Sequence, residues 1–210
     1  MLTPEPDCAL CPRLCTFRAE TRTRFPDWHN APVPAFGDGD AWLLIVGLAP
    51  GLRGANRTGR PFTGDYAGDL LFRTLKAHRL AEGDYGRERD DGLRLVGCRI
   101  SNAVRCVPPA NRPTPAEVRT CGRFLTAELA ALPRLRAVVA LGRVAHEAVL
   151  SALGVTRSAF PFAHGAVHRP RPPLLLADSY HCSRQNTNTG RLTEAMFDAV
   201  FRRICAEAAA

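Results

Sequence analysis

Short runs of apolar residues alternate along this chain with longer segments whose apolar positions recur at helical spacing. Such short runs fit strands that are buried on both faces of a sheet. Four strands are predicted from this pattern, at residues 43–46, 93–101, 137–141 and 174–177. Because helical segments separate them, the pattern predicts an α/β fold with a mainly parallel sheet and helices on both faces.

Helices are predicted between these strands and after the last one. The sequence TPAE from Thr114 is a capping box with proline at the first helical position, so a helix begins there and runs to about Leu132. The other helices are predicted over residues 70–80, over residues 144–153 and from Thr193 onward. Residues 1–42 have little periodic pattern and are expected to drape over the main body, and residues 154–173 are expected to form a loop.

The stretch after the first predicted strand, residues 47–65, is rich in glycine, which lets the backbone pass close to a bound group. Open α/β sheets build their sites at the carboxyl ends of strands, so we favour a binding loop over an ordinary surface loop. Neither a Walker A loop nor a dinucleotide fingerprint occurs here, and a nucleoside triphosphate or NAD site therefore has no support. The loop carries Asn56, Arg57, Arg60, Phe62 and Asp65.

Length and composition fit one core, since the chain has 210 residues of which 46% are hydrophobic. No apolar run approaches the roughly 18 residues of a membrane span, and the N-terminal sequence lacks the features of a secretory signal. We therefore expect a single domain over residues 1–210 that is cytoplasmic and makes no membrane contact. The net charge of +8 gives only mild support for a nucleic-acid partner. Every basic residue except Lys76 is arginine, a bias that coding composition could also produce.

The chain has eight cysteines, and an intracellular protein of this size is expected to use them as metal ligands rather than in disulfides. The spacing groups Cys8 with Cys11 and Cys106 with Cys121. Four thiolates from three segments can hold a tetrahedral zinc ion or an iron–sulfur cluster, and the spacing does not choose between them. Cys15 is an alternative ligand, whereas Cys98 and Cys205 are expected to lie in the core.

Polar and aromatic side chains follow three of the predicted strands. If the sheet is parallel, one cleft collects Phe62, Asp65, Asn102, Asn111 and His181. An aromatic ring could stack on a planar substrate, an asparagine could read its amide edge, and a histidine could face a carbonyl. Each residue alone has a simpler explanation as a turn residue or a solvated side chain. Their joint placement at strand ends favours a binding site.

Three segments resemble the signature motifs of the family 5 uracil-DNA glycosylases, the UDGb type: GLAPG…GANRTGRPFTGD, NAVRCVPPANRPTP and SYHCSRQNTNTGRLT. The resemblance covers most of the chain, from Cys8 to the last helix. It implies a three-layer α/β/α sandwich around a four-stranded parallel sheet, with a structural [4Fe–4S] cluster. It also implies hydrolysis of the N-glycosidic bond of uracil in DNA, with tolerance for hypoxanthine and xanthine. Because a base inside duplex DNA is out of reach, we expect the base to be flipped out first, and we expect the protein to act as a monomer.

The resemblance also implies roles for individual residues. Asp65 would activate water and stabilise the sugar cation, His181 would face the base carbonyl, and Asn111 is a further catalytic candidate. The implied substrate contacts are Phe62, which stacks on the base, Asn102, Gly47, Ala49 and Arg184. The implied cluster ligands are Cys8, Cys11, Cys106 and Cys121.

Two departures from the related families are visible. Leu48-Ala49 stands where family 4 enzymes have Glu-Ala, which shifts the catalytic weight onto Asp65. Cys182 follows His181 where related glycosylases often have proline. Two alternatives stay open: a non-catalytic or product-trapping protein that binds damaged DNA, and a zinc-stabilised hydrolase of small nucleosides.

Overall fold

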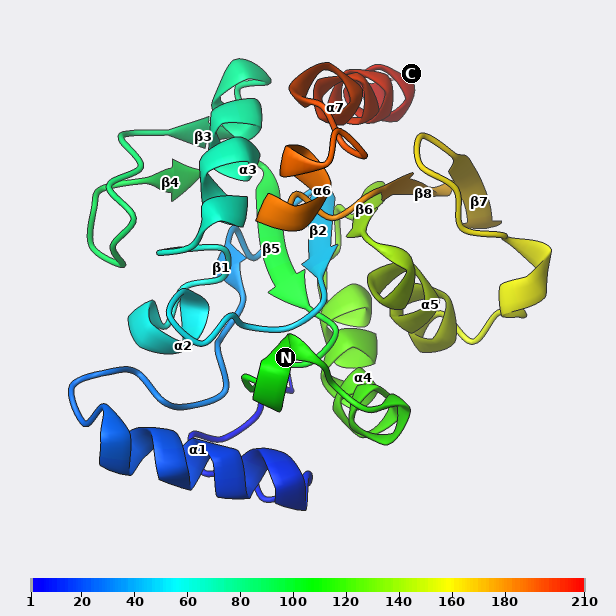
Figure 1. Cartoon of the computed structure of the whole chain (residues 1–210). Helices are drawn as coiled ribbons and strands as arrows, with labels where there is room; N and C mark the ends of the chain where they lie inside the picture. The colour runs from blue at the N-terminus through cyan, green and yellow to red at the C-terminus, as the bar shows by residue number, and fades with distance from the viewer. Residues whose placement is uncertain (1, 210) are drawn as a thin grey trace.

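The apolar runs form the centre of a six-stranded sheet with the order β1-β5-β2-β6-β8-β7 in the computed structural model, which describes residues 2–209 (Figure 1). The inner four strands, from β5 to β8 in that order, are parallel, as the sequence predicts, and the two edge strands pair antiparallel to them. The strands are β1 Phe36–Gly37, β2 Leu43–Gly47, β5 Cys98–Asn102, β6 Ala137–Leu141, β7 Val167–Arg171 and β8 Leu174–Ser179. A separate small sheet pairs β3, Ala81–Glu82, with β4, Arg94–Leu95.

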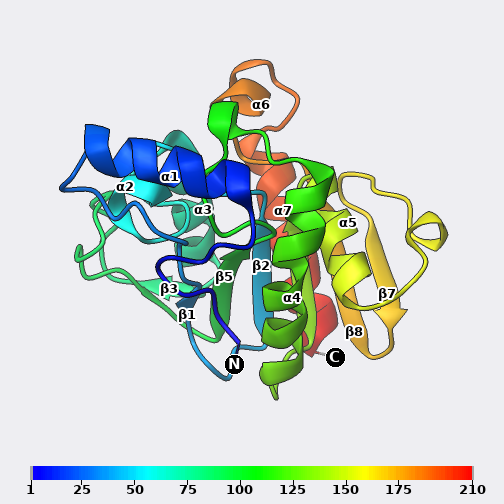
Figure 2. The same cartoon turned by 90° about the horizontal axis from the view of Figure 1, so that it is seen from below.

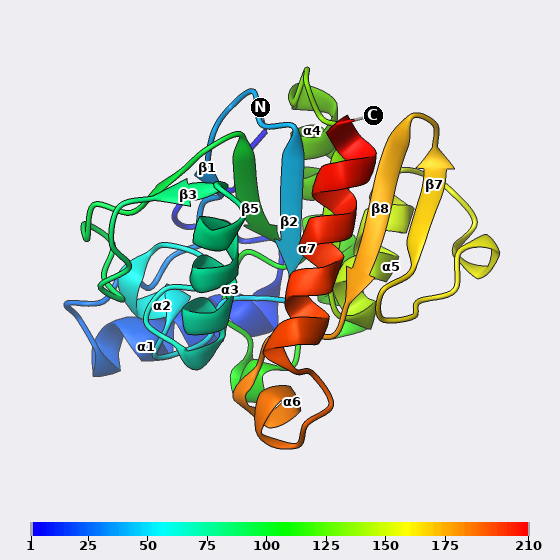
Figure 3. The ribbon, with the colours of Figure 1, turned by 90° about the horizontal axis from the view of Figure 1, so that it is seen from above.

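Helices cover both faces of this sheet, with α3 and α7 on one side and α4 and α5 on the other (Figures 1 and 3). The helices are α1 Pro12–Arg24, α2 Ala55–Thr58, α3 Tyr66–Ala77, α4 Pro115–Ala131, α5 Arg143–Ala152, α6 Arg184–Asn188 and α7 Glu194–Ala209, with short 3₁₀ turns η1 Pro109–Asn111 and η2 Arg157–Ala159. The capping box of α4 forms both of its hydrogen bonds. None of the helices within residues 2–209 is long and apolar enough to cross a membrane.

Strand β2 lies in the middle of the sheet and divides the core into two layers. Its five residues are all buried, and alternate side chains point to opposite faces. Leu43 and Ile45 pack in the cluster formed with α3 and α7, whereas Leu44 and Val46 pack in the cluster formed with α4 and α5. Burial on both faces explains why this strand reads as a continuous apolar run.

Two predicted boundaries are wrong for identifiable reasons. The predicted strand 93–101 is two strands, because Gly97 adopts a positive φ of 61° and turns the chain between β4 and β5. The predicted loop 154–173 contains β7, an edge strand interrupted by Pro170 and a register shift. Proline within a run argues against a strand, although it is tolerated at a sheet edge.

The N-terminal segment is more ordered than expected, since it contains the 13-residue helix α1, which runs across the molecule beside α4 (Figure 2). The buried side chains of α1 are Leu14, Arg18 and Thr21, so its inward face is largely polar. A polar inward face gives no apolar periodicity, which is why the sequence pattern does not reveal this helix.

Candidate active site and cysteine pocket

A cavity of about 580 Å³ opens at the carboxyl ends of β2, β5 and β8. This is the sheet edge at which open α/β folds place their ligands. The cavity is lined by seven of the residues expected from the sequence: Ala49, Phe62, Asp65, Asn102, Asn111, His181 and Arg184. Three strand ends far apart in the sequence therefore contribute to one site.

The floor of the cavity is set by the register of two neighbouring strands. The last residue of β2, Gly47, lies opposite the last residue of β5, Asn102. A Cβ atom on Gly47 would lie 2.5 Å from Asn102 Oδ1 and 2.6 Å from Phe62 Cζ. Glycine is therefore required at this strand end, because it lets the buried amide and the ring lie directly against the backbone.

Asp65 lines the cavity, and its two carboxylate oxygens have different neighbours. Its Oδ1 accepts a hydrogen bond from the Ala67 amide at 3.2 Å and caps helix α3. A Cβ atom on Gly54 would lie 2.5 Å from Oδ2, and one on Gly51 would lie 3.0 Å from it, so both glycines make room for this oxygen. Burial raises the pKa of Asp65 above its usual value, against the opposing effect of the amides of Gly68 and Ala67.

Phe62 and His181 form one wall. Their rings stack with centroids 5.7 Å apart and an angle of 23° between the planes. Phe62 has a φ of 55°, which is a strained conformation for a bulky residue. Strained backbone conformations of this kind cluster at functional sites. Burial lowers the pKa of His181 to about 4, so its imidazole is neutral near pH 7. The loop is held by Asn186, whose Nδ2 donates to the His181 carbonyl at 2.8 Å.

The two asparagines occupy different depths. Asn102 is 3% exposed and lies on the floor, whereas Asn111 is exposed at the mouth, at the end of η1. Asn111 and the preceding Ala110 both have positive φ, at 56° and 53°. The floor position favours Asn102 as the group that reads a base edge.

The mouth also carries a residue that the sequence analysis missed. Tyr66, the first residue of α3, lines the cavity and is 41% exposed. The guanidinium of Arg184 lies 5.6 Å from the centre of its ring, at the start of α6. The position of Tyr66 directly after Asp65 is the only signal that could have singled it out.

Cys182 is fully buried rather than part of the cavity lining. Its thiol donates to the Ala67 carbonyl at 3.5 Å, so it ties the loop of His181 to the first turn of α3. Cysteine in place of proline therefore adds a contact between the two segments that carry the candidate catalytic residues.

The cysteines expected as ligands line a second pocket, between α1, the segment after β5, and α4. They are Cys8, Cys11, Cys106 and Cys121. Cys15 lines the same pocket, but its thiol donates to the Cys8 carbonyl at 3.2 Å. Within residues 2–209, no three of these sulfur atoms lie within 4.8 Å of one another. Of the two cysteines expected in the core, Cys98 is buried and Cys205 is half-buried.

Asp178 is the centre of a His–Asp–His cluster in which His146 and Asp178 are buried and His168 is partly buried. Asp178 on β8 pairs with His146 at 2.7 Å and with His168 at 3.2 Å. The second ring nitrogen of His146 donates to the Phe160 carbonyl at 2.8 Å, so both nitrogens face acceptors. Burial alone would lower the pKa of His146, but the hydrogen bond and charge of Asp178 outweigh it and raise this pKa. These groups satisfy one another's hydrogen bonds and hold the loop that carries Phe160 near β8. Asp178 itself lies three residues before His181.

The sequence is similar to known proteins over most of its length. The model of a family described as the uracil DNA glycosylase superfamily matches residues 34–205. A type-5 uracil-DNA glycosylase of Thermus thermophilus is 52% identical over 198 residues, which cover 90% of this chain and 89% of that protein. The type-5 protein of Pyrobaculum aerophilum is 45% identical, covering 96% and 89%. A type-4 uracil-DNA glycosylase of Archaeoglobus fulgidus is 38% identical over 120 residues, covering 57% and 52%.

Proposed function

Since the chain belongs to the uracil DNA glycosylase superfamily, we propose that it removes uracil from DNA by hydrolysing the N-glycosidic bond, after the nucleotide has flipped into the cavity at the strand ends. The observation that carries the proposal is the meeting of an acid, an amide, an aromatic ring and a neutral imidazole around one cavity. We further propose that it acts as a cytoplasmic monomer in base excision repair.

Base recognition is assigned to the floor and one wall. Phe62 stacks on the flipped base, and the amide of Asn102 hydrogen-bonds its edge. Apolar Leu48 and Ala49 line another part of the cavity and demand no particular hydrogen bond there. That lining suits hypoxanthine and xanthine as well as uracil, so we include these bases among the substrates.

Catalysis is assigned to Asp65 and His181, the two residues lining the cavity whose pKa values depart from their usual ranges. Bond breaking leaves a cation-like sugar and a base that carries negative charge. Asp65 stabilises the sugar and orients water through the oxygen that helix α3 does not use, and neutral His181 donates a hydrogen bond to the base carbonyl. One pre-aimed group of this kind commonly supplies about 2.7–4 kcal/mol. Asn111 at the mouth is assigned an auxiliary role in positioning.

The mouth of the cavity is assigned the contacts with the DNA duplex. Arg184 is exposed at the start of α6 and lies over Tyr66, so it can enter the minor groove and fill the space that the flipped base leaves. The net charge of +8 supports contact with the phosphate backbone.

The cysteine pocket is assigned a structural [4Fe–4S] cluster. A tetrahedral zinc site with Zn–S bonds of about 2.3 Å places its sulfur atoms only about 3.8 Å apart. No three cysteine sulfur atoms within residues 2–209 lie within 4.8 Å of one another, which favours a cluster, in which each sulfur binds a different iron, over a tetrahedral zinc ion. Hydrolysis moves no electrons, so the cluster would serve the fold. It would tie residues 1–42 to the segment after β5 and to α4, within a single domain over residues 1–210.

The test is cleavage of oligonucleotides that carry one uracil, hypoxanthine or xanthine, each single- and double-stranded. We expect an alkali-labile site at the modified base, and strand cleavage there after alkali. A protein that binds the uracil strand tightly yet leaves no alkali-labile site would instead be a damaged-DNA binding protein.

A further inference from the structure

Arg18 is a buried cation whose partners come from the cysteine pocket. It lies on α1 and is 6% exposed. Its Nη1 donates to Cys106 Sγ at 3.6 Å, and its Nη2 donates to the Cys8 carbonyl at 2.9 Å. The part of the chain that the structure describes offers it no carboxylate at ion-pair distance. A buried charge requires a compensating charge, and here the nearest candidate is sulfur.

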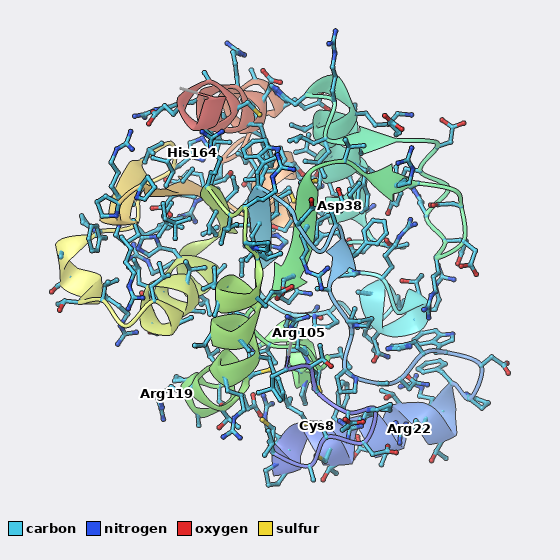
Figure 4. All side chains as sticks on the ribbon, turned by 180° about the vertical axis from the view of Figure 1, so that it is seen from behind. Cys8, Arg22, Asp38, Arg105, Arg119 and His164 are labelled. Carbon is cyan, nitrogen blue, oxygen red and sulfur yellow. The ribbon has the colours of Figure 1, made fainter. Side chains whose placement is uncertain are left out.

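Arg105 is a second buried cation that lines the same pocket. It is 3% exposed, and Figure 4 shows it between the sheet and the N-terminal segment that carries Cys8. Its backbone amide donates to Cys121 Sγ at 3.3 Å, and its Nη2 donates to Glu128. Its Nε is the one buried side-chain nitrogen or oxygen within residues 2–209 that has no hydrogen-bond partner. Native proteins rarely leave such a donor unused.

The carboxylate beside this pocket is already shared. Glu128 is fully buried and accepts hydrogen bonds from Arg99 Nε at 2.7 Å and from Ser101 Oγ at 2.6 Å, as well as from Arg105. Glu128 is therefore already shared when it pairs with Arg105, and it does not reach Arg105 Nε. Four thiolates carry four negative charges, of which a metal core neutralises only part.

We propose that Arg18 and Arg105 form a cationic clamp that donates hydrogen bonds to the sulfur atoms of the cluster and makes it easier to reduce. The inference rests on the cluster proposed above. Hydrogen bonds to sulfur and nearby positive charge stabilise an added electron and are established determinants of cluster potential. The clamp also joins the two ends of the pocket, because Arg18 comes from α1 and Arg105 follows β5.

The test is a redox titration of the purified, cluster-containing protein with dithionite, followed by visible absorbance. Arg18→Met removes the charge and the donors, Arg18→Lys keeps the charge, and Arg24→Met replaces an exposed arginine on the same helix as the matched control. In Arg18→Met the ratio of reduced to oxidised cluster at a fixed potential should fall by about tenfold, equivalent to 59 mV for one electron. The cluster should also bleach about tenfold faster in excess chelator.

Arg18→Lys should recover most of the reduced fraction, and Arg24→Met should match the parent protein. An Arg18→Met protein with the parent's reduced fraction would overturn the clamp and leave the glycosylase proposal standing. So would Lys and Met variants that shift equally, because that result would indicate packing rather than charge. A parent protein without iron would overturn the cluster and the clamp together. A parent protein that contains the cluster but excises no base would overturn the proposed glycosylase activity and leave the clamp standing.

Discussion

Replacing Asp65 by asparagine separates its two roles. Oδ1 caps α3 by accepting from Ala67, and Oδ2 lies beside Gly51 and Gly54. Asparagine caps helices about as well as aspartate, so the cap should survive the change. Only the negative charge and the proton-accepting ability of the second oxygen are lost.

The expected magnitudes have opposite signs for stability and activity. Burial raises the pKa of Asp65, so the folded state disfavours the charge, and at pH 7, above the usual pKa, the ionised form costs stability. Asp65→Asn removes that cost, and the melting temperature should stay equal or rise. The charge of Asp65 is expected to stabilise the transition state by about 2.7 kcal/mol or more, so its loss should slow cleavage by on the order of 10²-fold or more.

The assay is single-turnover cleavage of a duplex that carries one uracil, with thermal unfolding and DNA binding measured on the same samples. Asp69→Asn is the matched control, because Asp69 lies one turn along α3 and pairs with Arg87 at 2.7 Å, outside the cavity. It should cleave at the parent rate with equal or slightly lower stability. A folded Asp65→Asn protein that cleaves within a few-fold of the parent would reduce Asp65 to a helix cap and refute the catalytic assignment.

Four further outcomes are expected. Because burial lowers the pKa of His181 to about 4, the cleavage rate should show no titration near pH 6.5, and a step there that disappears in His181→Gln would contradict a neutral imidazole. Gly47→Ala should abolish cleavage, since its Cβ would lie 2.5 Å from Asn102 Oδ1, and parent-like kinetics would show that the floor can shift. Cys106→Ala should bleach the protein and lower its melting temperature, and a coloured, stable variant would show that another residue is the ligand. Arg184→Ala should slow cleavage of paired uracil more than of single-stranded uracil, and equal losses would exclude stack filling.

The inner sheet could be predicted because its strands are buried on both faces and read as apolar runs. Helix α4 could be predicted because its capping box is local in the sequence. Helix α1 could not, since its inward face includes Arg18, and a buried arginine is understood only with the cysteine pocket in view. Edge strand β7 was hidden by its proline, which looks like a loop residue until its antiparallel partner is known.

The sequence predicted that residues following several strands would meet in one cleft, because parallel strands bring their carboxyl ends together. What the sequence could not supply is how individual groups divide their contacts. The sequence alone does not say whether Asp65 caps a helix or acts in catalysis, whereas the structure gives each of its oxygens a different environment. The pairing of His146 with Asp178 spans 32 residues and depends on tertiary packing.

The docking of α1 has a consequence for how the chain is made. Leu14 packs with Val104, Cys121 and Phe124, so α1 leaves the ribosome well before its apolar partners, which lie about a hundred residues downstream. At typical synthesis rates of about 5–20 residues per second, those partners emerge about 5–20 s later. During that interval Cys8 and Cys11 are without Cys106 and Cys121, which complete the lining of the cysteine pocket. The docking of α1 and the completion of the cysteine pocket are therefore timed by translation, and slowing the ribosome before residue 124 should delay both.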